Sequence, residues 1–570
     1  MKDSKLGGWQ MRRRYAAGKA LIMAFAVLAG SLSGCGAKAE SSDTVQVQGS
    51  PENGGSEPDG RKDEEKQEEN APGSLQEGRE SSSAGNGSAA EMPVVEDGRI
   101  TVGGSQVSLD LEDEYTPWEE SAAVKIGLDE GNITIEGQGA QAEGSTVTIE
   151  KGGTYVLRGT LSDGAVFVDA GADDIVRLIL DGVNIHSETW AAVEVKEAGK
   201  TIISLEEGTS NTLSSGSGQD DQDNGEEKPG GALFGSGALT INGSGELKVE
   251  AGLGNGISSK DILKLVGGRL EITAAKHGLR GKDALAVYDG QAKITTTENG
   301  MKSDGLAVIF GGEIVVSDCE EGLEGEDVVI CGGSLDITSR DDGINASTDE
   351  ENTPQIYILG GTVTVNAEGD GIDSNGSIHM SGGEVTVYGP SERDNGALDY
   401  DGTFELTGGL LAAFGPGGME QNVTRADSQV SVLVDFQETQ AAGTTVTLLD
   451  KEGNEWYKGT GEKDFRTVVL SVPEMAVGSE YVVEAGENAI SFTPEETIIY
   501  VNKEGIQEAA SMGPGRGDPG NGRGGRKPEP PEGWEEGEKP KPPEGRKDGG
   551  RAEPPEGREE GERMKPSEGR

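Results

Sequence analysis

The chain has 570 residues, of which 93 are glycine, and aromatic residues make up only 4%. So much glycine disfavours a compact helical enzyme, because each glycine costs about 1 kcal/mol in a helix interior, and the lack of a Gly-X-Y period excludes collagen. The formal net charge of −54 argues against nucleic acid as a partner and is compatible with cation binding or a well-solvated secreted surface.

The N-terminus has the form of a secretory signal. Basic residues at Arg12–Arg14 and Lys19 precede the apolar run "ALIMAFAVLAG", which is too short for a spanning helix and is followed by "LSGC". "LSGC" resembles a bacterial lipobox, in which the cysteine is lipidated and becomes the mature N-terminus. We therefore expect a lipoprotein signal peptide over residues 1–34 and a membrane anchor on Cys35, at the extracellular face of the bacterial cell membrane.

Two regions lack the apolar periodicity of a folded segment. Residues 35–97 are rich in Ser, Gly, Glu, Asp and Pro and predict a disordered tether. Residues 511–570 carry a repeated "PPEG" element and predict a second disordered segment, rich in Pro, Gly, Glu and Arg. The folded part is expected between them.

Glycine pairs recur at a nearly fixed spacing between residues 98 and 427. They stand at 267–268, 311–312, 332–333, 360–361, 382–383 and 408–409, and Asp289-Gly290 fills the gap after the first pair, so the steps are 22, 22, 21, 28, 22 and 26 residues. A period in the twenties is typical of a solenoid, in which each repeat packs on its neighbours.

Apolar residues around each glycine pair have the two-residue spacing of strands. The predicted inward positions lie two residues before the first glycine and two and four residues after the second, as with Leu265, Leu270 and Ile272. Each repeat thus holds two short strands bent apart at the glycines, and no repeat contains the helix-length stretch of a leucine-rich repeat. The expected fold is all-β: a parallel β-helix of about 22 residues per coil over residues 98–427.

A motif of a polar residue, glycine and an apolar residue keeps the same register, as in "DDGINAS" and "GDGIDS". We expect it at a turn between strands, where equivalent residues of successive coils stack about 4.8 Å apart. Toward the C-terminus these columns are mostly acids and amides, and such oxygen donors suit Ca²⁺, the one cofactor that we expect. The alternative is a solvated acidic edge that discourages aggregation. The candidate ligands are Glu321, Glu324, Asp341, Asp342, Asn345, Asp370 and Asp373.

An outward column of hydroxyl and amide side chains ends in two aromatic residues. Tyr388 and Phe414 follow Thr338 and Asn366 in this column. Their rings are candidates for a platform that binds a sugar ring, and the alternative is that they cap the edge of the solenoid. Beyond the coils, alternating segments such as "VSVLVDF" and "RTVVLSV" predict a small β-sheet module over residues 428–510, which would cover the open end of the solenoid.

The stretches "GTYVLRGTLSDGAVFVDA", "GLRGKDALAV", "DDGINAS" and "GDGIDSNGSIHMSGGEVTV" resemble bacterial carbohydrate-binding β-helix proteins that are related in shape to pectate lyases. The resemblance covers roughly residues 125–420 and departs from the family in an insertion at Ser214–Gly231 and in the long tails. It implies a right-handed β-helix, calcium sites and the binding of acidic, pectin-like polysaccharides. The positions that match the calcium motif are Asp341, Asp342, Asn345, Asp370 and Asp373.

We therefore expect a non-catalytic surface protein that binds polysaccharide with calcium, helped by Arg280 and Lys302 one coil apart. A calcium-dependent lyase is the first alternative, because β-elimination needs a cation to neutralise the uronate and a basic side chain to remove a proton. Its candidate bases are Arg280, Lys302, Lys276 and Arg340. A purely structural or adhesive scaffold is the second alternative. The sequence predicts no oligomeric state.

Overall fold

The computed structural model describes residues 92–96, 98–216, 231–252, 254–348 and 352–508, all within one compact unit of the chain. The signal segment, Cys35, most of the expected tether and the whole C-terminal segment 511–570 lie outside these residues. The regular secondary structure of the described part consists of β-strands and one short 3-10 helix, η1 (Leu111–Asp113). It contains no helix long and apolar enough to cross a membrane.

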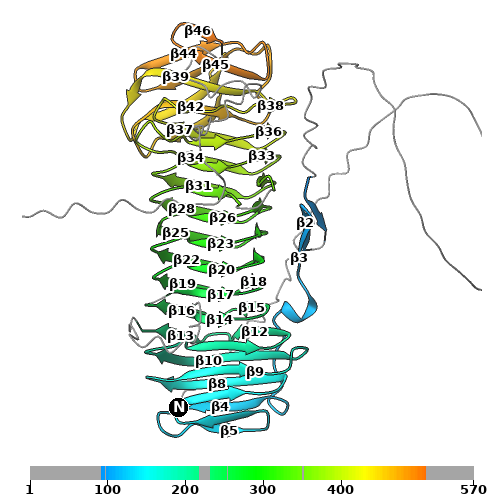
Figure 1. Cartoon of the computed structure of the whole chain (residues 1–570). Coiled ribbons are helices and arrows are strands. Elements are labelled where there is room, and N and C mark those ends of the chain that lie inside the picture. The colour runs from blue at the N-terminus through cyan, green and yellow to red at the C-terminus, as the bar shows by residue number, and fades with distance from the viewer. Residues whose placement is uncertain (1–91, 97, 217–230, 253, 349–351, 509–570) are drawn as a thin grey trace, which may run out of the picture. The chain divides into compact units, whose positions relative to one another are not determined.

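The predicted parallel β-solenoid is confirmed, and its coils stack three sheets whose strands run parallel except for one antiparallel pair at the start of the third sheet (Figure 1). The first sheet consists of β12 (Lys200–Leu205), β15 (Leu239–Gly243), β18 (Ile262–Leu265), β21 (Ala284–Val287), β24 (Leu306–Ile309), β27 (Asp327–Ile330), β30 (Gln355–Ile358), β33 (Ser377–Met380), β36 (Phe404–Leu406) and β38 (Arg425–Ala426). The second, called the groove sheet below, consists of β13 (Ser210–Ser215), β16 (Glu246–Ala251), β19 (Arg269–Ala274), β22 (Gln291–Thr296), β25 (Glu313–Cys319), β28 (Ser334–Ser339), β31 (Thr362–Ala367), β34 (Glu384–Tyr388) and β37 (Leu410–Gly415).

The third sheet contains the polar-glycine-apolar motifs. It consists of β6 (Ala140–Glu143), β7 (Thr146–Ile149), β9 (Ala165–Asp169), β11 (Val193–Glu197), β14 (Gly231–Gly235), β17 (Asn255–Ser259), β20 (Leu279–Gly281), β23 (Met301–Ser303), β26 (Leu323–Gly325), β29 (Ile344–Ala346), β32 (Ile372–Ser374) and β35 (Leu398–Tyr400). In most of these motifs the polar residue and the glycine, such as Asp342 and Gly343, lie at the predicted turn, and the apolar residue begins a short strand.

Two kinds of glycine make these coils possible. The second glycine of each pair has left-handed backbone, with φ of +107° at Gly290, a conformation that L side chains rarely adopt. Asp289 replaces the first glycine of that pair because only the second position needs the positive φ. The motif glycine instead allows close approach: a Cβ on Gly278 would lie 2.2 Å from Cγ2 of Ile294.

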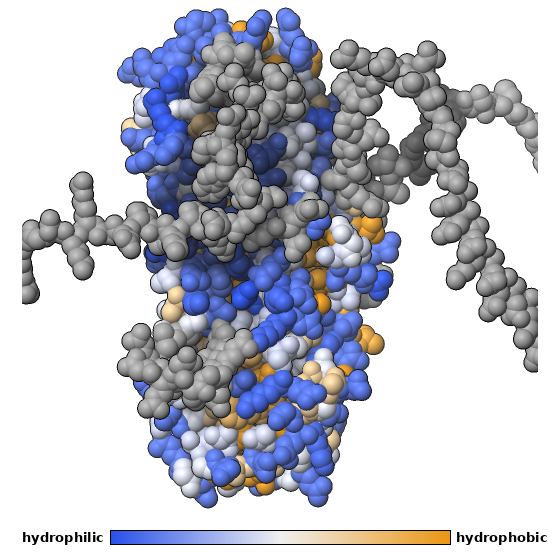
Figure 2. Space-filling view, in the orientation of Figure 1, coloured by the Kyte–Doolittle hydropathy of each residue, from blue (hydrophilic) through white to orange (hydrophobic). Residues whose placement is uncertain are grey.

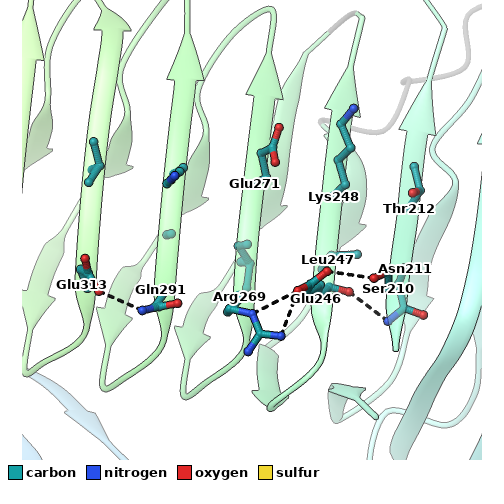
Figure 3. A pocket seen from close by; sticks show the side chains of 14 residues that line it. Ser210, Asn211, Thr212, Glu246, Leu247, Lys248, Arg269, Glu271, Gln291 and Glu313 are labelled. Carbon is teal, nitrogen blue, oxygen red and sulfur yellow. Dashed lines mark hydrogen bonds and ion pairs between the residues drawn. The ribbon is translucent and has the colours of Figure 1, made fainter. Parts of the chain in front are cut away.

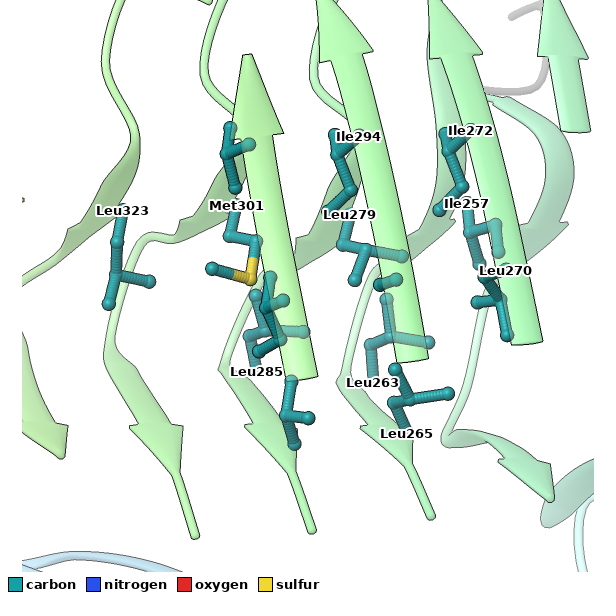
Figure 4. Close-up of a cluster of buried hydrophobic side chains, with 14 of the residues drawn as sticks. Ile257, Leu263, Leu265, Leu270, Ile272, Leu279, Leu285, Ile294, Met301 and Leu323 are labelled. Carbon is teal, nitrogen blue, oxygen red and sulfur yellow. The ribbon is translucent and has the colours of Figure 1, made fainter. Parts of the chain in front are cut away.

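The three sheets enclose one continuous apolar core (Figure 4). Leu270, Ala292 and Ile314 pair in register on successive coils of the groove sheet, as predicted, and each is at most 4% exposed. Ile257, Leu279 and other apolar residues of the motif close the core from the third sheet. Each coil adds its side chains to the columns of the coil before. The core therefore extends along the solenoid axis, and each coil packs only on its two neighbours.

Antiparallel strands close both ends of the solenoid. At the start, β4 (Val124–Leu128) pairs with β5 (Thr134–Glu136) and, in parallel, with β8 (Gly153–Leu161), which leads to β10 (Ile175–Ser187). At the other end, β42 (Phe465–Ser471) pairs antiparallel with β37, which ends the parallel ladder. The remaining strands of this C-terminal module are β39 (Ser431–Gln440), β40 (Thr445–Asp450), β41 (Glu455–Thr460), β43 (Tyr481–Ala485), β44 (Asn488–Phe492), β45 (Ile498–Asn502) and β46 (Gly505–Gln507).

A segment before the solenoid, residues 94–96 and 98–113, forms what we call the strap. It contains β1 (Val94–Glu96), β2 (Arg99–Val102), β3 (Ser105–Ser108) and η1. Ile100, Val102 and Val107 are buried against outward-facing side chains of the first sheet. The sequence-based boundaries are wrong here, because residues 94–96 were assigned to the tether and residues 98–113 to the β-helix. In β21, β24 and β27 the first sheet has apolar residues on both faces, so these strands read as apolar runs with no sign of which face another segment covers.

A buried ion-pair cluster anchors the strap. Asp113 is 0% exposed, and its carboxylate lies 2.7 Å from Nζ of Lys264 and 3.1 Å from Nζ of Lys200. The hydroxyl of Thr240 donates to the same carboxylate at 2.7 Å. The anchor therefore joins the strap to three coils of the first sheet.

Candidate functional site

The predicted acids and amides lie along the outer face of the third sheet. We call this set the acidic column: Glu324, Asn345, Asp373 and Asp399, with Glu321, Asp342 and Asp370 beside them. Strand pairing aligns Arg280 with Lys302, Lys302 with Glu324, and Glu324 with Asn345. Asp373 and Asp399 continue the same column. The sequence interpretation did not include Asp399, because the last coil has Ala397 instead of a glycine before its apolar residue. The strand register puts Leu398 opposite Ile372, so that Ala397 occupies the glycine position.

The residues that precede the motif glycine support the backbone of the next coil. Oδ1 of Asp342 accepts a hydrogen bond from the backbone N–H of Asp370 at 2.7 Å, and Oδ1 of Asp370 accepts one from Gly396 at 2.6 Å. Asn255 does the same for His277 at 3.3 Å. A carboxylate or an amide oxygen serves equally well in this role, which explains why both occur. Asp341, in contrast, is exposed beside this column.

Three carboxyl groups near the acidic column have strongly raised pKa values. Burial, followed by repulsion from Glu324, raises the pKa of Glu321 to about 8. Burial, followed by repulsion from neighbouring aspartates, raises the pKa of Asp342 and of Asp373 to about 7. These groups therefore gain a proton, or need a cation, near neutral pH.

Basic and amide side chains compensate only part of this charge. Lys302 forms an ion pair with Glu324, and Arg280 forms one with Asp304 at 3.0 Å. Nδ2 of Asn345 donates to Glu321 at 3.3 Å, but the buried Oδ1 of Asn345 has no hydrogen-bond partner. Among the described residues, no three Asp, Glu, His or Cys side chains converge as a metal cluster. The column thus offers suitable oxygen donors without a closed cage.

The aromatic pair does not form an open platform. Tyr388 and Phe414 stack with ring centroids 5.4 Å apart, but Phe414 is only 3% exposed and packs edge-on against Phe465 of the C-terminal module. Tyr388 is half-buried against the same cluster. The sugar-platform interpretation of Phe414 was therefore wrong, and the pair belongs to the contact between the module and the solenoid.

A shallow groove of about 660 Å³ lies on the outer face of the groove sheet, and the sequence interpretation missed it (Figure 3). Five adjacent strands, β13, β16, β19, β22 and β25, form its floor. Its polar lining side chains are Ser210, Asn211, Thr212, Glu246, Lys248, Arg269, Glu271, Gln291, Lys293 and Glu313. The alternation in "ELKVEA", "RLEITA" and "QAKITT" was the available signal, since the residues between the core positions must face outward.

Two rows of side chains cross the strands in this groove (Figure 3). In the first row, Glu246 accepts hydrogen bonds from Ser210 at 2.8 Å and from Arg269 at 3.0 Å, and both contacts lower the pKa of Glu246. Further along this row, Gln291 donates to Glu313 at 2.9 Å.

In the second row, strand pairing aligns Lys248, Glu271 and Lys293 on three successive coils. Lys248 forms an ion pair at 2.8 Å with Glu250, outside the row. Glu271 and Lys293 are exposed, and neither has an ion pair or side-chain hydrogen bond with a described residue. The groove therefore combines a preorganised row with a row that retains free donors and acceptors.

A parallel β-solenoid with a polar groove across its coils is a scaffold on which elongated ligands can bind. A family model described as "Carbohydrate-binding domain-containing protein" matches residues 143–307 and 297–439. These matches cover more than half of the chain and include the whole groove sheet, from β13 to β37, and most of the solenoid. The chain belongs to this family of carbohydrate-binding domain-containing proteins.

Two individual proteins are similar to parts of this chain. A "Carbohydrate-binding domain-containing protein" of Acetivibrio thermocellus is 33% identical over 151 residues, which are 26% of this chain and 53% of that relative. The match thus spans about half of the relative's length. A solved structure, the gadolinium derivative of a polysaccharide lyase-like protein from C. thermocellum, shares 24% identity and covers 50% of this chain and 96% of that one, with a TM-score of 0.35.

Proposed function

We propose that the protein binds polysaccharide without cleaving it, in the shallow groove on the outer face of the groove sheet. The observation that carries the proposal is the polar groove that crosses five strands of a rigid sheet in a member of a carbohydrate-binding family. Hydroxyl groups of a glycan both donate and accept hydrogen bonds, and the groove offers carboxylate acceptors beside amine, guanidinium and amide donors. An open groove of this kind suits a polymer better than a small molecule, which needs a deeper enclosure.

A glycan array, run with the full-length protein with and without Ca²⁺, tests this proposal. The expected result is retention on a subset of polysaccharides. Retention on none of them would contradict the proposed function. Absorbance from unsaturated products, followed during incubation with polygalacturonate and Ca²⁺, tests the non-catalytic part, and a steady rise would establish a lyase instead. The candidate bases Arg280 and Lys302 are already engaged with carboxylates, which favours binding over catalysis.

A second candidate is calcium-bridged binding of an acidic polysaccharide at the acidic column. The unpartnered Oδ1 of Asn345 and the raised pKa values of Asp342 and Asp373 support it. Ca²⁺ takes six to eight oxygen ligands, so a bridging ion would take only some of them from Asn345, Asp373 and their neighbours and the others from uronate groups of the glycan. Without such an ion, a chain of net charge −54 would repel a polyanion.

Calcium removal tests this second candidate. Binding to pectin should vanish with EDTA and return with excess Ca²⁺, and the melting temperature of metal-stripped protein should rise with Ca²⁺. The double variant Asp342→Asn/Asp370→Asn keeps the oxygen acceptors for the backbone while it removes two charges, so it should lose most of the calcium response. A variant as responsive as the parent would remove the assignment.

We also propose that the protein is anchored at the cell surface through a lipid on Cys35. The basic region, apolar run and "LSGC" sequence support this proposal. The mass of the mature N-terminal peptide from a bacterial membrane fraction tests it. A diacylated peptide that begins at Cys35 is expected, and a chain that still begins at Met1 would contradict it.

A further inference from the structure

The charge of the groove indicates what kind of glycan it takes. Three carboxylates and three cations line it, and they are Glu246, Glu271, Glu313, Lys248, Arg269 and Lys293. The whole chain, in contrast, has 103 acidic and 49 basic residues. The groove is therefore balanced in charge on an otherwise anionic molecule, and neither a polyanion nor a polycation finds a field of opposite sign there.

The partners of the first row make a charged ligand still less favourable. The guanidinium of Arg269 is already engaged by Glu246, and the carboxylate of Glu313 accepts from Gln291. Because Arg269 and Glu246 neutralise one another, a uronate finds little net attraction at this guanidinium. A hydroxyl depends on no net charge and can use the spare capacity of the row, since a carboxylate accepts about four hydrogen bonds and a guanidinium donates five.

The second row supplies the groups that are free to bind. Glu271 and Lys293 pair in register on adjacent coils, which places an acceptor and a donor about 4.8 Å apart along the solenoid axis. Both are exposed in the groove. A linear chain that lies across the strands meets a new rung of donors and acceptors at each coil, whereas a chain that lies along one strand meets only one rung.

We propose that the groove binds an uncharged, hydroxyl-rich linear polysaccharide that runs along the solenoid axis, with Glu271 and Lys293 as specificity-determining contacts. The inference rests on the proposed polysaccharide binding and adds the charge class, the orientation and two residues. Glu271 accepts hydrogen bonds from sugar hydroxyls, and Lys293 donates to hydroxyl or ring oxygens of the next residue of the glycan. This mode of binding requires no cation.

Affinity gel electrophoresis of the full-length protein tests the proposal, with mixed-linkage β-glucan, galactomannan and polygalacturonate as probes. At least one of the two uncharged polysaccharides should retard the protein, and EDTA should not change the retardation. Raising NaCl from about 0.1 to about 1 M shortens the Debye length from about 10 to about 3 Å and should also leave it unchanged.

The double variant Glu271→Ala/Lys293→Ala should weaken this retardation at least about tenfold in apparent affinity. Its matched control is Lys451→Ala/Glu452→Ala, which removes an exposed Lys and Glu from the C-terminal module and leaves the net charge equally unchanged. The control should bind like the parent. Because all four side chains are exposed, both variants should melt like the parent.

The remaining outcomes separate the inference from the proposed function. Binding to polygalacturonate alone, lost in high salt or EDTA, would overturn the uncharged-glycan inference while polysaccharide binding stands. Retention of uncharged glycan by the Glu271/Lys293 variant would overturn the assignment of these two residues. Retardation by no probe here and by no glycan on the array would overturn both.

Discussion

Single residues define the inner and outer walls of each coil. Val365 is buried in the core, whereas Thr364, one position earlier, faces outward beside Asp336. The sequence was sufficient to assign these positions because alternation within one strand is local information. It was not sufficient for Phe414, which obeys the same alternation but is buried by a module that follows later in the chain.

We predict that Val365→Asp destabilises the protein by several kcal/mol, because a carboxylate would enter the apolar core without a partner. Thr364→Asp should cost less than about 1 kcal/mol, since it adds only repulsion with Asp336 across the strands. Urea unfolding of both variants measures the difference. Equal damage from the two substitutions would mean that the strand register is wrong.

The elements differ in how much of them local sequence determines. The groove sheet and the third sheet follow from glycine spacing and strand periodicity. The strap does not, because its docking depends on Asp113 meeting Lys264, residues far apart in sequence. The acidic column was predicted as a set of residues, but the support that Asp342 gives to the next coil became visible only in the structure.

At the scale of the elements, we predict that the acidic column makes the free energy of unfolding depend on pH. The folded-state pKa values of Glu321, Asp342 and Asp373 are raised to about 8, about 7 and about 7, above ordinary unfolded values of about 4. The unfolded chain therefore releases protons more readily, and the free energy of unfolding falls as pH rises from about 4 through about 8.

Urea unfolding in metal-free buffer across this range measures the effect. The variant Glu321→Gln/Asp342→Asn/Asp373→Asn should show a flatter profile between these pH values. A parent profile that rises with pH over the same range would contradict the account of this column.

A second element-scale prediction concerns the strap. Asp113→Ala leaves the buried Lys264 without its main partner and should cost about 3–5 kcal/mol of strap docking, whereas Asp110→Ala, whose carboxylate is 47% exposed, should cost about 1 kcal/mol or less. Limited proteolysis should cut the strap of the Asp113 variant and leave the solenoid intact. Similar resistance in the two variants would show that the ion pair is not the anchor.

At the scale of the whole molecule, the sequence predicted the solenoid but not where it binds. The visible face is mainly hydrophilic (Figure 2), so hydropathy alone marks no binding surface on it. The stacked acids and amides in the sequence favoured the acidic column instead. The groove depends on side chains from five coils that align only after folding. A net charge of −54 for the whole chain does not indicate that one surface is balanced in charge. Its two free side chains became visible only when the partners of the neighbouring residues were known.

The most direct test of binding in the groove is carboxyl footprinting of the full-length protein with a carbodiimide and glycine ethyl ester, read by peptide mass spectrometry. The measurement compares labelling with and without the tightest-binding uncharged polysaccharide of the panel. We predict that the glycan protects Glu271 and Glu313 and leaves Asp399 of the acidic column and Glu452 of the module unchanged. Unchanged labelling of Glu271 together with protection of Asp399 would contradict the account and place binding on the acidic column.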